Sequence, residues 1–156
     1  MAIIGGGANG HLAEFVTVTI GNQLFGLPIH LVRDVFVPER LTPVPLAPSN
    51  VAGILNLRGR VTTVIELRSR LDLEMPRQSQ PAMVVGIELT GECYGLLVDS
   101  VGEVMLLESS AREPNPANLD PRLARVAAGV YQIEGQLMIV LDVDRVLDVK
   151  NEFMAA

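Results

Sequence analysis

The sequence contains an internal repeat, and this feature restricts the possible folds more than any other. One block recurs at a constant offset of 69 positions, and a second block, further along each copy, recurs at an offset of 76. The first block pairs Phe25 with Tyr94, Gly26 with Gly95, Leu27 with Leu96, Ile29 with Val98, Val32 with Val101, Asp34 with Glu103, and Val35 with Val104. The second pairs Gly53 with Gly129, Leu57 with Ile133, Gly59 with Gly135, Val61 with Leu137, Val64 with Val140, Glu66 with Asp142, Leu67 with Val143, and Leu71 with Leu147. Two blocks in the same order favour duplication over chance similarity between glycine-flanked strands.

The two repeats, residues 15–71 and 84–147, are each too short to bury a large core alone. Units of about 70 residues or fewer are marginally stable, so we expect the repeats to pack together. Short strand-rich units avoid exposed sheet edges best by curling into barrels. The sequence therefore predicts a mainly β protein with two small β-barrel subdomains packed together and a few short helices.

Local patterns predict the elements within each repeat. Strands are expected at residues 15–20, 24–29, 61–67, 83–89, 94–98, 104–107, 129–133 and 137–143. Apolar residues at near-helical spacing predict a short helix over residues 31–36, and a helical turn is expected within residues 51–57. A short helix or a turn is expected to begin at 68–71, and a last helix is expected over 144–149, capped by Asp144. Residues 1–13 and 150–156 are expected to be loose tails and residues 72–81 a linker.

Charge and cysteine content exclude several classes of protein. The net charge of the 156-residue chain is −6, which opposes binding to phosphate backbones, so we expect no nucleic-acid partner. Cys93 is the only cysteine, so no intrachain disulfide can form. No run of 18 apolar residues and no signal-peptide pattern occurs. We therefore expect a cytoplasmic protein that does not insert into a membrane.

No pattern in the sequence points to catalysis. Gly5–Gly10 satisfies the pattern GxGxxG, but a dinucleotide site needs a full strand before the glycines and a helix after them. His11 and His30 are the only histidines, and one cysteine adds little to a metal site. We expect no cofactor, no metal and no enzymatic activity. A nucleotide-binding enzyme that uses the glycine-rich N-terminus is kept as an alternative hypothesis.

One segment carries a family resemblance. Residues 53–68, with the sequence GILNLRGRVTTVIELR, resemble the signature G-x-x-N-L-R-G-x-[IV]-x-P-[VI]-x-D-L-R of the CheW-like adaptors of bacterial chemotaxis. Residues 25–35 and 94–104 support the match, which extends over residues 14–149. Two positions depart from the pattern, since Thr63 replaces the usual Pro and Glu66 the usual Asp.

The resemblance implies two intertwined SH3-like β-barrel subdomains and a non-catalytic scaffold. Such an adaptor links transmembrane chemoreceptors (methyl-accepting chemotaxis proteins) to the regulatory domain of the histidine kinase CheA, and contacts with other proteins recruit it to membrane receptor arrays. The helical tip of the receptor is expected in a groove between the subdomains, near Val32, Asn56, Leu57 and Arg58.

Kinase contacts are expected at the barrel ends. They are placed loosely around residues 37–43 and the loop 112–122, at Val37, Leu41, Pro43, Arg112 and Arg122. An adaptor of a parallel pathway, such as twitching or gliding motility, would share these features, so the sequence leaves both pathways open.

Overall fold

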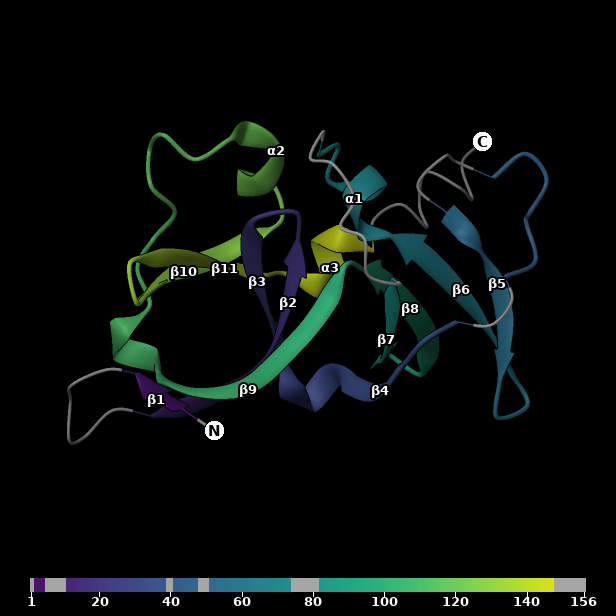
Figure 1. Cartoon of the computed structure of the whole chain (residues 1–156), viewed down its shortest axis with the longest axis horizontal. Coiled ribbons are helices and arrows are strands. Elements are labelled where there is room, and N and C mark those ends of the chain that lie inside the picture. The colour runs from purple at the N-terminus through teal and green to yellow at the C-terminus, as the bar shows by residue number, and fades with distance from the viewer. Residues whose placement is uncertain (1, 5–10, 39–40, 48–50, 74–81, 148–156) are drawn as a thin grey trace.

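The computed structural model describes residues 2–4, 11–38, 41–47, 51–73 and 82–147, and these form two sheets joined side by side (Figure 1). The first sheet has the strand order β1-β9-β2-β3-β11-β10, and the second has the order β4-β7-β8-β6-β5. The strands of the first sheet are β1 (Ala2–Ile4), β2 (Leu12–Ile20), β3 (Gln23–Pro28), β9 (Ser100–Glu108), β10 (Ala127–Ile133) and β11 (Gln136–Leu141). Those of the second are β4 (Val32–Phe36), β5 (Val51–Leu57), β6 (Arg60–Glu66), β7 (Met83–Leu89) and β8 (Glu92–Val98).

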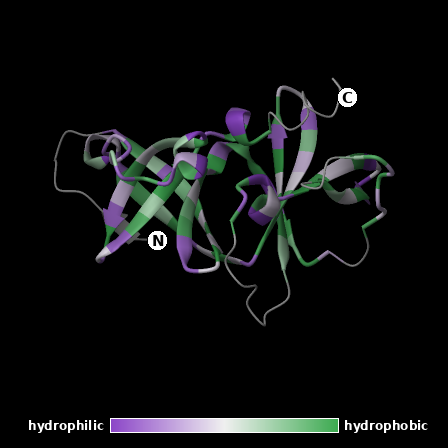
Figure 2. Cartoon of the chain, turned by 90° about the horizontal axis from the view of Figure 1, so that it is seen from above, coloured by the Kyte–Doolittle hydropathy of each residue, from purple (hydrophilic) through white to green (hydrophobic). Residues whose placement is uncertain are grey.

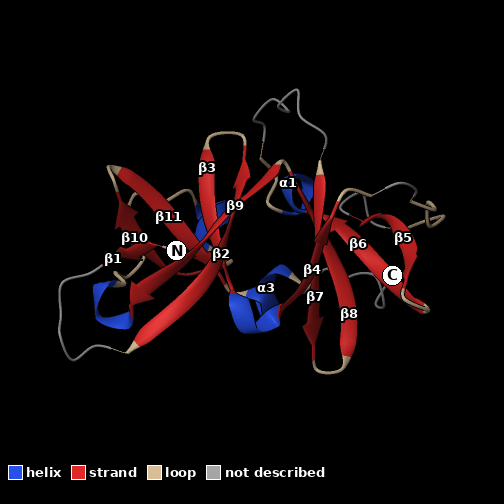
Figure 3. Ribbon diagram, turned by 60° about the horizontal axis from the view of Figure 1, so that its bottom comes forward, coloured by secondary structure: helices blue, strands red, loops and turns tan. Residues whose placement is uncertain are grey.

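Short helices lie mainly at the ends of strands. They are η1 (Ile29–Leu31), α1 (Leu67–Arg70), η2 (Ser109–Ala111), α2 (Pro121–Ala124) and α3 (Val143–Val146). Figure 3 shows α1 and α3 between the two sheets. The prediction of a mainly β protein with a few short helices is confirmed.

The two repeats exchange strands. Strands β2 to β6 and helix α1 of the first repeat correspond to β7 to β11 and α3 of the second. The orders β9-β2-β3-β11-β10 and β4-β7-β8-β6-β5 are therefore the same order, written once for each sheet. Each sheet combines a hairpin from one repeat with three strands from the other, so neither repeat forms a sheet alone. In the chain, the second sheet is continuous from β4 to β8, while both ends of the chain contribute to the first.

Glycines at matched positions allow the same close approach in both sheets. Isolated antiparallel bridges join Thr42 to Ile54 beside β5 and Glu113 to Val130 beside β10. A Cβ on Gly53 would lie 2.8 Å from the Thr42 carbonyl oxygen, and its φ is +154°. A Cβ on Gly129, with φ +131°, would lie 3.1 Å from the carbonyl oxygen of Glu113. Only glycine fits both the backbone angle and the space, which explains why it recurs in the two repeats.

The core is shared between the sheets. One cluster of buried residues contains Val18 and Phe25 of the first sheet together with Ile65, Ile87 and Leu96 of the second. A smaller cluster lies within the first sheet, around an edge-to-face contact of two aromatic rings, Phe15 and Tyr131. Figure 2 shows the apolar segments concentrated along the inner strands of both sheets. This shared burial is the physical reason why two small units remain together.

Two predicted helical segments are strands. Residues 32–36 form β4, which pairs with β7, and residues 51–57 form β5, which pairs with β6. Segments this short make marginal helices in water, whereas an adjacent strand satisfies their backbone groups at once. The near-helical spacing of apolar residues was therefore misleading.

Two further expectations need correction. The prediction of a loose tail over residues 1–13 is wrong at Ala2–Ile4, which pairs with β9, and at Leu12 and Ala13, which begin β2. The last helix is capped by Asp142 rather than Asp144, because β11 ends at Leu141 and the Asp142 carboxylate accepts a hydrogen bond from the Arg145 amide. Residues 74–81 of the expected linker and the tail 150–156 lie outside the described residues.

Candidate functional site

Arg58 lies in a tight turn between two strands of the second sheet. The β5–β6 hairpin closes with Arg58 and Gly59 as its two central residues, which have φ angles of 53° and 81°. Positive φ at both positions defines the turn type that fits the twist of a two-residue hairpin. The side-chain oxygen of Asn56 accepts a hydrogen bond from the Gly59 amide at 2.9 Å. The Asn-Leu-Arg-Gly sequence therefore builds the turn that presents the guanidinium.

The Arg58 guanidinium reaches across to strand β4. Its Nη2 lies 2.9 Å from Oδ1 of Asp34, while 76% of the Arg58 side chain stays exposed. Ion pairs this exposed contribute little to stability, about 0–1 kcal/mol. The pair therefore orients the guanidinium while leaving much of it accessible to a partner.

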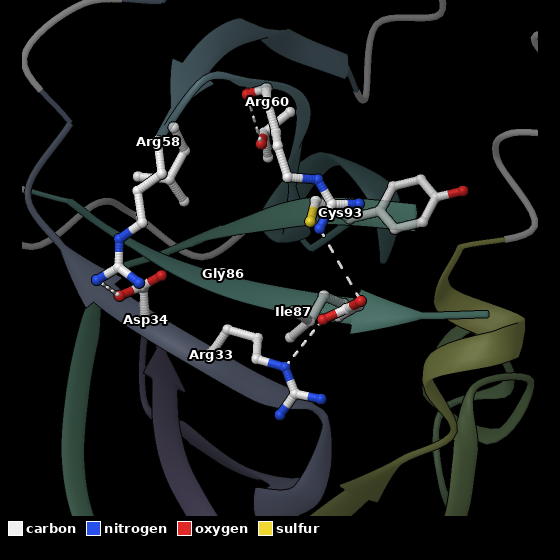
Figure 4. Close-up of a pocket in the computed structure, with 11 residues that line it drawn as sticks. Arg33, Asp34, Arg58, Arg60, Gly86, Ile87 and Cys93 are labelled. Atoms are coloured by element: carbon white, nitrogen blue, oxygen red, sulfur yellow. Dashed lines mark hydrogen bonds and ion pairs between the residues drawn. The ribbon is translucent and has the colours of Figure 1, made fainter. Parts of the chain in front are cut away.

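A small hollow lies beside this ion pair (Figure 4). Its volume is about 160 Å³, below the roughly 300–1,000 Å³ of sites for drug-sized ligands. Glu88 lies in its wall and binds two guanidiniums, with distances of 3.0 Å to Arg33 Nε and 3.9 Å to Arg60 Nη1. The other lining residues are Asp34, Leu57, Arg58, Thr62, Gly86, Ile87, Cys93 and Tyr94. A hollow of this size and chemistry suits one protein side chain better than a small-molecule substrate.

Only some of the residues predicted to contact the receptor lie together in the structure. Leu57 and Arg58 line the hollow, and Asn56 lies beneath the turn as its hydrogen-bond acceptor. Val32 is half-buried and packs against the large core cluster, one residue before the lining residue Arg33. All the residues that line the hollow belong to the second sheet and its hairpin turn.

Sequence reasoning missed four charged members of this site. They come from three strands, and their charges meet only because β4, β7, β8 and β6 are neighbours in one sheet. These residues are Arg33 and Asp34 on β4, Arg60 on β6 and Glu88 on β7. The repeat had matched Asp34 with Glu103, which marked an acidic position but not its partner. Strand order, which the sequence did not reveal, was the missing information.

The predicted kinase contacts lie in two separate places. Leu41 and Pro43 flank Thr42, which bridges to β5 at the edge of the second sheet, and Val37 follows β4 with 54% of its surface exposed. Arg112 lies beside β10 of the first sheet, because its side chain approaches Gly129 and the next residue, Glu113, bridges to Val130. The segments around residues 42 and 113 are equivalent in the two repeats. The residues predicted to contact the kinase therefore lie at corresponding ends of the two subdomains.

Arg112 and Arg122, the two arginines predicted to contact the kinase, have different neighbours. The Arg112 guanidinium lies 5.8 Å from the ring centroids of both Phe15 and Tyr131, within the range of cation–π attraction. Arg122 lies on α2 and donates side-chain and backbone hydrogen bonds to Asp120. These bonds lower the pKa of Asp120 from 3.8 to about 2.

Helix α1 connects the two sheets through two guanidiniums. Arg68 forms a buried ion pair with Asp99, the single residue between β8 of the second sheet and β9 of the first. The same carboxylate accepts a hydrogen bond from the Gly21 amide at 2.8 Å, in the turn between β2 and β3. Arg70 donates to the Val146 carbonyl of α3 at 2.8 Å. These contacts fix the position of one sheet on the other.

The chemical alternatives find no support in the described parts of the chain. The segment after the glycine-rich pattern is strand β2, whereas a dinucleotide site requires a helix there. Among residues 2–4, 11–38, 41–47, 51–73 and 82–147, no three His, Cys, Asp or Glu side chains gather as a metal site would require. In those same ranges, no helix has both the length and the apolar character needed to span a bilayer.

Comparison with known proteins agrees with this architecture. Residues 14–151 match the family model described as CheW-like domain. The chain is 28% identical over 133 residues to a chemotaxis protein CheW of Rhizobium meliloti, covering 85% of this chain and 86% of the relative. It is 25% identical over 145 residues to a chemotaxis protein CheW of Helicobacter pylori, covering 93% and 86%.

A solved structure gives the same result in three dimensions. The crystal structure of the scaffolding protein TtCheW from Thermoanaerobacter tengcongensis superposes with a TM-score of 0.81 at 25% identity, covering 97% of this chain and 98% of that one. The family match covers both repeats and the turn that holds Arg58, so this chain belongs to the CheW-like family.

Proposed function

We propose that the protein is a non-catalytic chemotaxis scaffold that couples transmembrane chemoreceptors to the histidine kinase CheA. The match of residues 14–151 to the CheW-like family is the observation that carries this proposal. Relatives named chemotaxis protein CheW and a structural neighbour described as a scaffolding protein agree with it. The protein acts in the cytoplasm and reaches receptor arrays through protein contacts.

Arg58 is the central residue of the proposed receptor contact. Its guanidinium is exposed and held by the turn and by Asp34, so it offers several remaining N–H donors to a carboxylate or a helix-end carbonyl. Leu57 beside it adds apolar area, and Asn56 maintains the turn. Val32 contributes through the packing of β4. A pre-oriented arginine next to an apolar residue is a common anchor of protein interfaces.

Kinase binding is assigned to the two barrel ends. Val37 beside β4, and Leu41 and Pro43 beside β5, offer apolar residues on the second sheet, and Arg112 and Arg122 are the two guanidiniums of the segment 112–122 on the first. Contacts on different surfaces allow one molecule to hold both partners. Such a scaffold transmits a signal only if its contact energies differ between receptor states.

The variant Arg58→Glu tests the receptor contact. Glu134 occupies the position equivalent to Arg58 in the β10–β11 turn, with a φ of 49° before Gly135, so this turn type accepts a glutamate. We therefore expect Arg58→Glu to fold normally and to lose co-sedimentation with receptor-containing membranes by at least about ten-fold, or 1.4 kcal/mol. Glu134→Arg is the matched control and should bind receptor normally.

The kinase provides the second half of the test. Arg58→Glu should keep its binding to purified CheA, whereas Val37→Glu should weaken kinase binding and keep receptor binding. Unchanged receptor affinity in Arg58→Glu would refute the assigned receptor site. A wild-type chain that binds neither receptor nor kinase would refute the scaffold function itself.

A further inference from the structure

The N-terminal strand β1 adds three residues to one edge of the first sheet. Ala2, Ile3 and Ile4 pair in parallel with Met105, Leu106 and Leu107 of β9. On its other side, β9 pairs with β2 along most of its nine residues. Figure 1 shows β1 beneath the end of β9, away from the second sheet. The three-residue strand therefore covers part of a much longer sheet edge.

A strand of this kind is held weakly. It contributes one short parallel ladder, and parallel pairing is slightly less stable per residue than antiparallel pairing. If β1 leaves, β9 becomes an edge strand with free backbone donors and acceptors, which readily pair with another chain.

The topology lets β1 reach a second molecule. Ile4 pairs opposite Leu107 and Leu12 opposite Glu108, so β1 and β2 meet the same end of β9 from its two sides. Seven residues, 5–11, connect them, and four of these are glycines. A connection of this length spans up to about 25 Å when extended, more than twice the roughly 10 Å between two strands that flank a third one. The same linker therefore permits pairing with the β9 of another copy.

We propose that a second copy of the chain is the alternative occupant of this edge, and that two molecules exchange their residues 2–4 to form a strand-swapped dimer. The exchanged strands make the same backbone pairs as in the monomer. The balance between monomer and dimer therefore depends mainly on the protein concentration. A connection of few residues gives an effective concentration of roughly millimolar. The monomer is closed at micromolar concentration, and exchange rises as the protein approaches millimolar concentration. This inference does not depend on the proposed coupling function.

Disulfide trapping measures the exchange directly. All variants carry Cys93→Ser, which removes the single native thiol. Ile3 and Leu106 are Cα partners in the ladder, a spacing within the range of a disulfide. Leu106 is half-buried between two buried neighbours, so its side chain points away from the core. One chain carrying both Ile3→Cys and Leu106→Cys should therefore form an intramolecular disulfide at about 10 μM.

Mixing the two single-cysteine variants reports on exchange between molecules. The disulfide-linked heterodimer should increase about in proportion to concentration, up to about a hundred-fold between 10 μM and 1 mM. The control mixture pairs Ile3→Cys with Gln132→Cys, an exposed position on β10 at the opposite edge of the sheet. A heterodimer yield no higher than that of the control would overturn the proposal.

Two further outcomes are informative. If the double-cysteine chain also fails to cross-link, the pairing of β1 with β9 is wrong and the exchange falls with it. A deletion of residues 1–10 should stay monomeric at 1 mM by light scattering while the full chain dimerises. Equal dimerisation of the two would place the contact elsewhere and would also overturn the proposal. Receptor and kinase binding of the deletion variant measures the coupling function separately.

Discussion

The buried ion pair between Arg68 and Asp99 gives the sharpest test of how the two sheets are joined. Only 10% of the Arg68 side chain and 8% of the Asp99 side chain are exposed. Asp99 is the whole connection between β8 and β9, and it also binds the Gly21 amide. Asp99→Ala therefore removes the carboxylate that pairs with the buried Arg68 guanidinium and that accepts the hydrogen bond of the Gly21 amide.

The expected cost is large. Removing one partner of a buried pair typically destabilises a protein by about 3–5 kcal/mol. Total stabilities of single domains are about 5–15 kcal/mol, so a substantial fraction would be lost. With a urea m-value of about 2 kcal/mol/M, the unfolding midpoint of Asp99→Ala should fall by about 2 M. Circular dichroism at increasing urea concentrations measures this midpoint.

A double-mutant cycle separates the pair from its surroundings. Arg68→Met should also destabilise, and the double variant should lose clearly less than the sum of the two single losses, because each single variant already removes the whole interaction between the two charges. The exposed pair between Arg33 and Glu88, with 55% and 32% of the side chains exposed, is the matched control. Arg33→Met should cost less than about 1 kcal/mol. Single losses at Arg68 and Asp99 as small as this, or fully additive ones, would refute the reasoning.

Two further predictions concern the repeats and acid stability. A Cβ on Gly95 would lie 2.7 Å from Cγ1 of Val84, a stiff side chain, whereas on the equivalent Gly26 it would meet the flexible end of Met138. Gly95→Ala should therefore lower the free energy of unfolding by about 1–3 kcal/mol and Gly26→Ala by less, as measured by urea unfolding; the reverse order would contradict the packing. The pKa of Asp120 is about 2, below its ordinary 3.8, so the stability it provides is complete above pH 3.8 and is lost as the pH falls through about 2. A carboxyl titration followed by NMR should give that value, and an ordinary pKa would show that its hydrogen bonds do not form in solution.

The sequence identified the fold class because its evidence was local and repeated. Alternating apolar residues marked most strands, and the recurrence of Gly53 at Gly129 marked the same backbone requirement in both sheets. The exchange of strands between the repeats was not visible, because periodicity describes one strand and its two faces but not its neighbours. β4 was mistaken for a helix for the same reason, since its stabilising partner β7 lies about 50 residues away in the chain.

At the candidate site, the turn was predictable and its charged neighbours were not. Arg58 and Gly59 stand between two strand-like segments, so a tight hairpin presenting an arginine followed from the order of residues. Asp34 lies 24 positions earlier, and it meets Arg58 only because the second sheet places β4 within reach of that hairpin. An ion pair between residues far apart in the sequence can be predicted only when the order of the strands in the sheet is known.

Strand exchange also bears on the proposed scaffold function, because a protein that couples two partners has to hold them in a fixed geometry. The chain passes between the sheets at η1 and at Asp99, and the second passage is one residue long. Together with the buried pair of Arg68 and the hydrogen bonds of Arg70, this short link opposes rotation of one sheet against the other. In the proposed scaffold, this link would keep a receptor docked at Arg58 at a constant distance from a kinase docked on the first sheet. A movement of the receptor would then displace the kinase. A substitution that removes the contact of Arg68 or of Arg70 should therefore weaken signal transmission from receptor to kinase before it abolishes the binding of either partner.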